Sequence, residues 1–232
     1  MANGMLKKIK NIVLRRNSVV SPDLKYCMNS YSQEGEDRVL ERLFEGKSNG
    51  FYIDIGAHHP FRFSNTYLFY KKGWRGINID PMPGMKEDFE KHRPSDINLE
   101  IGISKNNEIL DYYNFKETAL NTFSESLANS YIKKQWELKN IIKIKTYPLS
   151  EIFDKYLTPN CKIDFMTIDI EGLEFEVLLE NDWIKFRPDI LLVEILDFNL
   201  SDFSNNLIVN YLNTVGYEII AKTKNTVFFK NI

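Results

Sequence analysis

One stretch, residues 50–60, constrains the fold of this chain more than any other. The run Phe51–Ile55 is rich in strand-forming residues and leads directly into Gly56 and Ala57. This pattern predicts a buried strand that ends in a tight turn, where the backbone can approach a ligand closely. The first hypothesis is therefore a nucleotide-type binding site at the end of this strand.

A second strand-forming run, Gly76–Ile79, ends on an acid, Asp80. The apolar segment 67–70 lies between the two runs and suits a connecting helix. In such a βαβ unit, an acid after the second strand can accept hydrogen bonds from both ribose hydroxyls of a nucleoside seated over the first turn. We predict this role for Asp80, while Asp54 orders the turn or holds the polar end of the ligand.

The turn departs from the dinucleotide fingerprint. It has one glycine, Gly56, where Gly-x-Gly-x-x-Gly needs three, and no basic residue is placed for a pyrophosphate. A nucleoside without phosphates, such as S-adenosylmethionine, therefore fits better than NAD. Taken alone, each residue also has a structural explanation, Gly56 as a turn glycine and Asp80 as a helix cap.

At these positions the sequence resembles the FkbM-type methyltransferases, which are class I S-adenosylmethionine-dependent O-methyltransferases. The resemblance implies an α/β fold with a mixed seven-stranded sheet, helices on both faces and S-adenosylmethionine as the methyl donor. Family members more usually carry Glu where Asp80 stands, a change that keeps a carboxylate for the ribose. Five ordered segments within residues 31–195 carry the resemblance: 32–37, 51–60, 64–66, 73–81 and 168–172.

The resemblance and the class I topology also place other side chains at the cofactor. Asn65 and Thr66, which otherwise suit a helix cap, line the site by resemblance. Ser104 follows the expected third strand, where class I topology puts it within reach of the exocyclic amine of adenine. Gln33 and Asp37 are expected at the rim of the cofactor or acceptor pocket, although acids in this segment also suit the first turn of a helix.

Two histidines and three acids are the candidates for catalysis and acceptor binding. His58 and His59 follow the cofactor turn, and histidine can deprotonate a hydroxyl near neutral pH. Asp169 ends another strand and is expected at the same sheet edge, in contact with the cofactor and in support of the base. We expect His59, Glu171 and Glu194 to contact the acceptor.

The three acids offer two chemistries if they converge. One of them can be a general base with a raised pKa, or Asp169 and Glu194 can hold a divalent cation. The sequence does not decide between these alternatives. Glu171 also suits the start of a helix.

Hydrophobic periodicity predicts the remaining elements. Two strands, Ile109–Phe115 and Ile141–Tyr147, flank a polar and aromatic segment that is expected to shape the acceptor site, although loops share this composition. The other predicted elements are helices Gln33–Phe44 and Asn205–Val215, a helix that begins near Leu173, sheet strands Ile97–Ile103, Cys161–Asp169 and Asp189–Leu196, and a hairpin of Tyr217–Ala221 and Val227–Phe229.

Composition favours one catalytic domain, residues 31–232. A chain of 232 residues, 43% of them hydrophobic, can bury one sizeable core and is short for two. The 30 basic and 32 acidic residues give a net charge of −2, so nothing indicates specific nucleic-acid binding. Cys27 and Cys161 are the two cysteines, without the spacing of a disulfide framework or zinc site, which is consistent with a reducing cytoplasm.

Residues 1–30 are predicted to form a basic N-terminal arm or helix. Five basic residues alternate with apolar ones within residues 6–16, and no acid precedes Asp23. Such an amphipathic helix can lie on an anionic membrane surface, and a helix packed on the domain is the alternative. No apolar run of about eighteen residues is present to span a membrane. We therefore expect a cytoplasmic protein, with peripheral contact at the inner face of a membrane as a hypothesis.

Two other classes of function remain open. A nicotinamide-dependent oxidoreductase uses the same strand, turn and acid, but the missing glycines argue against it. A noncatalytic nucleoside-binding or membrane-associated scaffold is supported only by the basic arm. The resemblance favours methyl transfer to a hydroxyl of a sugar, a polysaccharide precursor or another small metabolite.

Overall fold

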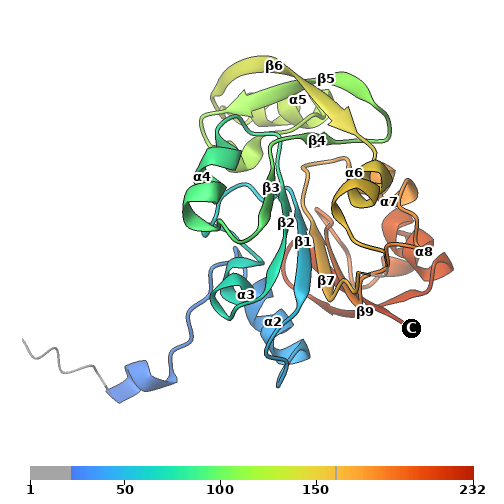
Figure 1. Ribbon diagram of the computed structural model, residues 1–232. Coiled ribbons are helices and arrows are strands. Elements are labelled where there is room, and N and C mark those ends of the chain that lie inside the picture. Colours follow the sequence, from blue (N-terminus) through green and yellow to red (C-terminus); the bar gives the residue numbers. More distant parts are fainter. Residues whose placement is uncertain (1–21, 160) are drawn as a thin grey trace, which may run out of the picture.

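A seven-stranded sheet forms the centre of the protein (Figure 1). The structure is a computed structural model that describes residues 22–159 and 161–232, so residues 1–21 of the basic arm lie outside the described part. In sheet order the first five strands are parallel, and β10 runs antiparallel to both β8 and β9. This is the mixed class I arrangement that the resemblance implied. The strands in order are β3 (Ile97–Leu99), β2 (Arg75–Ile79), β1 (Phe51–Ile55), β7 (Phe165–Ile168), β8 (Ile190–Glu194), β10 (Thr226–Asn231) and β9 (Tyr217–Lys222).

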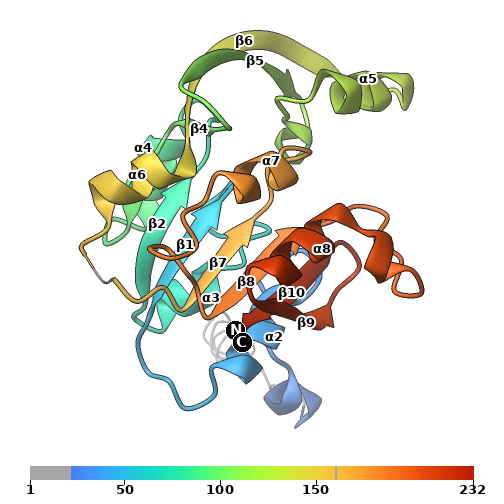
Figure 2. The ribbon, with the colours of Figure 1, turned by 90° about the vertical axis from the view of Figure 1, so that its right-hand side faces the viewer.

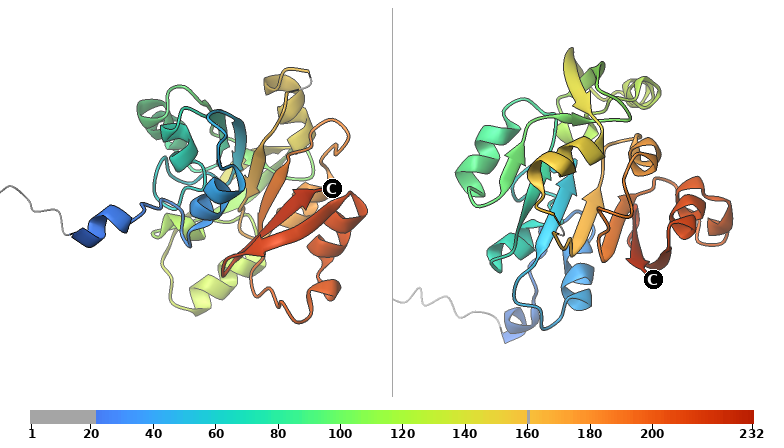
Figure 3. Two further views of the ribbon diagram at one scale, coloured as in Figure 1. Left: turned by 90° about the horizontal axis from the view of Figure 1, so that it is seen from below. Right: turned by 45° about the vertical axis from the view of Figure 1, so that its right-hand side comes forward.

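Helices cover both faces of this sheet, because its strands carry apolar side chains on both faces. Ile53 and Ile77 pack with α6, α7 and α8, whereas Tyr52 and Phe165 pack with α2 and α3. Figure 3 shows the hairpin of β9 and β10 (red) at one edge of the sheet, away from α4 (green). The helices are α2 (Glu36–Leu43), α3 (Tyr67–Lys71), α4 (Met85–His92), α6 (Leu149–Tyr156), α7 (Glu174–Leu179) and α8 (Leu207–Thr214).

A second, three-stranded sheet leaves the main sheet after β3 and arches beyond the ends of its strands (Figure 2). The predicted single strand Ile97–Ile103 is therefore wrong, because its first part belongs to the main sheet and its last part to the small one. Gly102 permits the change of sheet, since a Cβ there would lie 2.7 Å from Cγ2 of Thr146. The small sheet has the order β4 (Gly102–Ile103), β6 (Leu138–Tyr147) and β5 (Glu108–Phe115), with η2 (Thr118–Leu120) and α5 (Glu125–Lys133) between β5 and β6.

The predicted helices are shorter in the structure. Helix α2 begins at Glu36 and not at Gln33, because Gly35 adopts the left-handed region at φ 91°. The apolar side chains of Val39, Leu40, Leu43 and Phe44 predict the inward face of this helix, but Leu43 is 42% exposed and does not belong to it. Among the described residues, no helix is both long and apolar enough to cross a membrane.

The carboxyl ends of the parallel strands collect the predicted site residues at one sheet edge. Gly56 follows β1, Asp80 follows β2, Asp169 follows β7 and Glu194 is the last residue of β8. Gly56, Asp80 and Asp169 lie at strand ends that the sequence pattern predicted, whereas β8 ends at Glu194 and not at the predicted Leu196.

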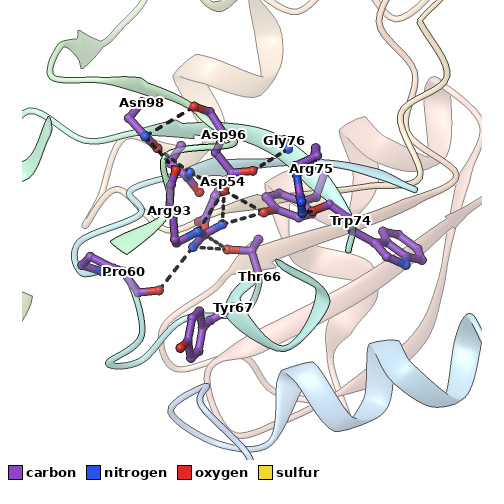
Figure 4. A network of polar contacts seen from close by, with 12 residues as sticks. Asp54, Pro60, Thr66, Tyr67, Trp74, Arg75, Gly76, Arg93, Asp96 and Asn98 are labelled. Atoms are coloured by element: carbon purple, nitrogen blue, oxygen red, sulfur yellow. Dashed lines mark hydrogen bonds and ion pairs between the residues drawn. The ribbon is translucent and has the colours of Figure 1, made fainter. Parts of the chain in front are cut away.

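A buried guanidinium fixes the loop that follows β1 (Figure 4). Arg93 is fully buried; its Nε donates to Oδ2 of Asp96 at 2.9 Å, and its Nη2 donates to the Tyr52 hydroxyl at 2.8 Å. Its Nη1 donates to Oγ1 of Thr66 at 3.0 Å, and that hydroxyl donates to Oδ2 of Asp54 at 2.6 Å. Arg93 therefore connects the loop to β1 and to the turn before β3.

Replacing Arg93 with Met should lower the free energy of unfolding by about 3–5 kcal/mol, because the substitution leaves Asp96 buried without its counter-charge. Chemical denaturation measures the change. The matched control is Arg42→Met, since Arg42 pairs with Glu45 on the surface with side chains 78% and 70% exposed. Arg42→Met should lower the free energy of unfolding by less than about 1 kcal/mol. Equal losses in the two variants would show that the buried network contributes no special stability.

Candidate active site

An open cleft lies at the carboxyl edge of the main sheet, beneath the small sheet. A smaller hollow adjoins it and shares Gln33, Phe63 and Asp169 with the cleft. The smaller hollow adds Asn65 and Glu194. The polar and aromatic residues that line the main cleft are Gln33, His58, Phe63, Asp80, Tyr112, Thr118, Asn121, Phe123, Asp169 and Glu171.

Gly56 brings the first turn into contact with the loop after β7. Its φ is +84°, and a Cβ at this position would lie only 1.6 Å from the carbonyl oxygen of Asp169. A side chain here would therefore force the two loops apart as well as strain the backbone. The glycine is required by this contact between loops, whatever ligand the cleft binds.

Asp80 lines the cleft and is held there by two backbone amides. Its Oδ2 accepts from the amide of His58 and its Oδ1 from the amide of Met82, each at 2.8 Å. Burial raises the pKa of Asp80 to about 6, while the two amides act in the opposite direction. Each carboxylate oxygen has a second lone pair, so the fixed carboxylate can still accept a hydrogen bond from a ligand.

The two histidines have different surroundings. His58 lines the cleft, and its Nε2 lies 2.8 Å from Oγ1 of Thr118. Burial, with the positive charge of Arg62, lowers the pKa of His58 to about 4. His59 is not among the residues that line the cleft; its Nδ1 accepts from the backbone amides of Phe61 and Arg62 at 3.3 and 3.1 Å.

Four acids gather where β7 and β8 end. Oxygen atoms of Asp169, Glu174 and Glu194 lie within 4.8 Å of one another. Burial and the neighbouring negative charges raise the pKa of Asp169 well above its usual value and that of Glu194 to about 8. Burial also raises the pKa of Glu171 to about 7. The expected convergence of Asp169 with Glu194 is present, and the expected divalent cation stays a prediction.

Several predicted site residues lie behind the cleft lining. Asp54 and Thr66 bond to each other beneath the first turn, as expected for a residue that orders the turn. Asn65 lines the smaller hollow and donates to Oγ1 of Thr167 at 3.0 Å. Ala57 packs on Met85 and Phe89 of α4. None of these contacts tests the proposed cofactor roles, which stay predictions.

Two further predicted residues are engaged elsewhere. Asp37 is fully buried and accepts from the Ser30 hydroxyl at 2.6 Å and the Tyr31 amide at 2.7 Å, so its carboxylate orders the segment before α2. The Ser104 hydroxyl donates to Oγ1 of Thr146 at 2.7 Å. Neither side chain lines the cleft. A direct contact of either with the cofactor would need a rearrangement of these bonds.

Sequence reasoning missed four of the polar and aromatic cleft residues: Phe63, Tyr112, Thr118 and Phe123. Tyr112 lies on the predicted strand Ile109–Phe115, where it is buried next to exposed Asp111, and the strand pattern was the available signal. Thr118 begins the short helix η2, whereas Phe63 and Phe123 lie outside helices and strands, so no hydrophobic period marks these three positions.

The mixed seven-stranded sheet, with a cleft at the carboxyl ends of its parallel strands, defines the chain as an α/β protein of the class I methyltransferase fold. The sequence matches the family described as the methyltransferase FkbM domain over residues 54–219, which is most of the chain. The chain therefore belongs to the FkbM family of methyltransferases. Among solved structures, it is similar to a TehB-like SAM-dependent methyltransferase from Corynebacterium glutamicum, with 10% identity and a TM-score of 0.42 over 99% of this chain and 97% of that chain. No curated protein matched the sequence.

The cleft fits S-adenosylmethionine, the methyl donor that this family implies. Asp80 offers a fixed carboxylate for the ribose beside apolar Ile79 and Ile101. Within the described residues, the cleft lining includes no Lys or Arg that would hold a phosphate, and it includes Asp169 and Glu171. A ligand with positive charge and no phosphate suits this lining.

Replacing Asp80 with Asn should weaken binding of S-adenosylhomocysteine at least tenfold, because two hydrogen bonds from ribose to a charged acceptor are each worth about 1.5 kcal/mol or more. Calorimetric titration measures the affinity. For the wild type, affinity should fall as the pH drops below about 6, since the ionised acceptor is lost there. Glu87→Gln, an exposed position on α4, is the control that keeps normal affinity; equal affinity in both variants would remove Asp80 from the site.

Proposed function

We propose that this methyltransferase transfers the methyl group to a hydroxyl oxygen of a small polar acceptor, such as a sugar or a polysaccharide precursor. The observation that carries the proposal is a set of carboxylates with raised pKa values in the same cleft as Asp80. A carboxyl group whose pKa lies near neutral pH is suited to accept a proton during the reaction. The proposed cofactor and the proposed proton acceptor thus lie in one cleft.

A hydroxyl acceptor needs this arrangement because its oxygen becomes a good nucleophile only as its proton leaves. When bound, S-adenosylmethionine supplies a methyl group on a positively charged sulfur. The protein must then align the acceptor with that methyl group and remove one proton. Asp80 positions the nucleoside, and the acids at the ends of β7 and β8 lie where a proton acceptor is needed.

The walls of the cleft support a polar, ring-shaped acceptor. Gln33, Thr118 and Asn121 bring hydrogen-bonding groups, and Phe63 and Tyr112 bring aromatic rings. This mixture of a few polar groups with apolar surface is typical of small-molecule sites and suits a sugar. The two free cysteines accord with the further proposal that the protein works in the cytoplasm.

The test is the identification of the methylated atom. The protein is incubated with S-adenosylmethionine carrying a ¹³C-methyl group and with a panel of nucleotide sugars, free sugars and oligosaccharides. Carbon NMR of the products should show the label as an O-methyl ether, and the same panel without protein should show none. Label found on nitrogen or carbon would contradict O-methyl transfer and leave the family assignment standing.

A further inference from the structure

The backbone of Glu171 has a conformation that is uncommon for a side chain of its size. Its φ is +54°, and the following Gly172 has φ +105°. A residue other than glycine in this region carries strain, which persists only where surrounding contacts fix it and which often marks a functional position. The strained residue lies in the wall of the cleft.

Two contacts from the insertion between β3 and β7, which contains the small sheet and α5, hold Glu171 in place. The Thr122 hydroxyl donates to the carbonyl oxygen of Glu171 at 2.7 Å. The Tyr131 hydroxyl of α5 donates to Oε2 of Glu171, also at 2.7 Å. Among the described residues, Oε1 of Glu171 makes no hydrogen bond. The insertion therefore fixes the backbone and one carboxylate oxygen and leaves the second oxygen available.

The histidines are less suited to accept the acceptor proton. Two backbone amides occupy Nδ1 of His59, which places its proton on Nε2, and the ring does not line the cleft. Nε2 of His58 already pairs with the Thr118 hydroxyl at 2.8 Å. With its pKa lowered to about 4, His58 is also a weak base.

The other acids are already engaged. Oxygen atoms of Asp169, Glu174 and Glu194 lie within 4.8 Å of one another, and carboxyl groups this close do not all ionise, so at least one of them already carries a proton. One oxygen of Glu174 accepts from the amides of Ile170 and Gly172 at 3.0 and 3.1 Å, so Glu174 supports the loop that carries Glu171. Glu171 lies outside this cluster of three, and it combines one oxygen fixed by Tyr131 with one oxygen available to the acceptor.

We propose that Glu171 is the general base of this methyltransferase and that Tyr131 is the residue that positions its carboxylate. The inference rests on the proposed O-methyl transfer. As the acceptor oxygen bonds to the methyl carbon, the carbon–sulfur bond breaks with its electron pair on sulfur, and the hydroxyl proton passes to Oε1 of Glu171. The products are an O-methyl ether, a neutral thioether and a protonated Glu171, which then returns its proton to water.

The surroundings of Glu171 set its proton affinity. Burial raises its pKa to about 7, and the bond from Tyr131 acts in the opposite direction by favouring the ionised form. Burial and Glu171 raise the pKa of Tyr131 in turn, so the phenol stays a donor at neutral pH. The titratable groups that face Glu171 are Tyr131 of α5, Tyr112 of β5, Asp169 and Glu174 of its own loop and helix, and Glu194 of β8.

The first experiment compares Glu171→Gln with Glu176→Gln, an exposed position on α7. Glu171→Gln should lower kcat by roughly 10²- to 10⁴-fold and leave the affinity for S-adenosylhomocysteine within about twofold. Glu176→Gln should leave both unchanged. If Glu171→Gln keeps kcat within tenfold of the wild type, or loses S-adenosylhomocysteine affinity tenfold, Glu171 is not the base. A wild type that methylates no hydroxyl would instead refute the proposed function.

The second experiment combines Tyr131→Phe with Glu171→Gln in a double-mutant cycle. Tyr131→Phe alone should lower kcat by roughly tenfold or more and leave the KM for the acceptor and the affinity for S-adenosylhomocysteine within about twofold, because the hydroxyl of Tyr131 acts by holding Oε2 of Glu171. In the Glu171→Gln protein, Tyr131→Phe should cause little further loss of kcat. A further loss as large as that in the wild type, or a loss that appears only in KM, would overturn the positioning role.

Discussion

The buried Arg93 guanidinium is the interaction on which the cleft depends most. It donates to Asp96, to the Tyr52 hydroxyl and to Thr66, and through Thr66 it reaches Asp54 inside β1. A buried charge is tolerated only when its partners are complete, so this network sets the path of the chain between β1 and α3. That path carries His58 and Phe63 into the cleft wall and provides the backbone amide of His58 that fixes Asp80. The position of the proposed ribose acceptor is therefore decided by a side chain outside the cleft.

The shape of the cleft also depends on a contact between the loops that follow two neighbouring strands, β1 and β7. The loops after β1 and β7 touch at Gly56, where the carbonyl of Asp169 occupies the place of a Cβ. This close contact places Asp80 and the acids of β7 and β8 around one volume. The small sheet completes the volume from the other side, because Thr122 and Tyr131 both hold Glu171. The insertion between β3 and β7 thus acts as part of the proposed catalytic machinery as well as a cover.

The sequence predicted features that depend on a short stretch of residues, such as strand ends, and missed those that depend on contacts between residues far apart in the chain. Asp80 and Gly56 were predictable because each follows a strand with a clear pattern. The same patterns located the strands of the main sheet, although Ile97–Ile103 was wrongly predicted as one strand, and the arrangement of seven strands came from the family resemblance. Arg93 was not predictable, since an isolated arginine after a helix usually lies at the surface. The split of Ile97–Ile103 depends on the fit of Gly102 against Thr146, 44 residues away in the chain, and the pairing of Tyr131 with Glu171 spans 40 residues. The hydrogen bonds that occupy Nε2 of His58 and Nδ1 of His59 could not be predicted from the sequence pattern either.

The central claim is that this cleft binds the nucleoside of S-adenosylmethionine and not a dinucleotide. Isothermal titration of the wild-type protein with S-adenosylhomocysteine, and in parallel with NAD, tests the claim most directly. We expect saturable binding of one S-adenosylhomocysteine per chain and no heat of binding with NAD, because Asp80 is the proposed ribose acceptor and the cleft lining, within the described residues, includes no Lys or Arg for a pyrophosphate. Saturable binding of NAD, or no binding of S-adenosylhomocysteine by the folded protein, would contradict it.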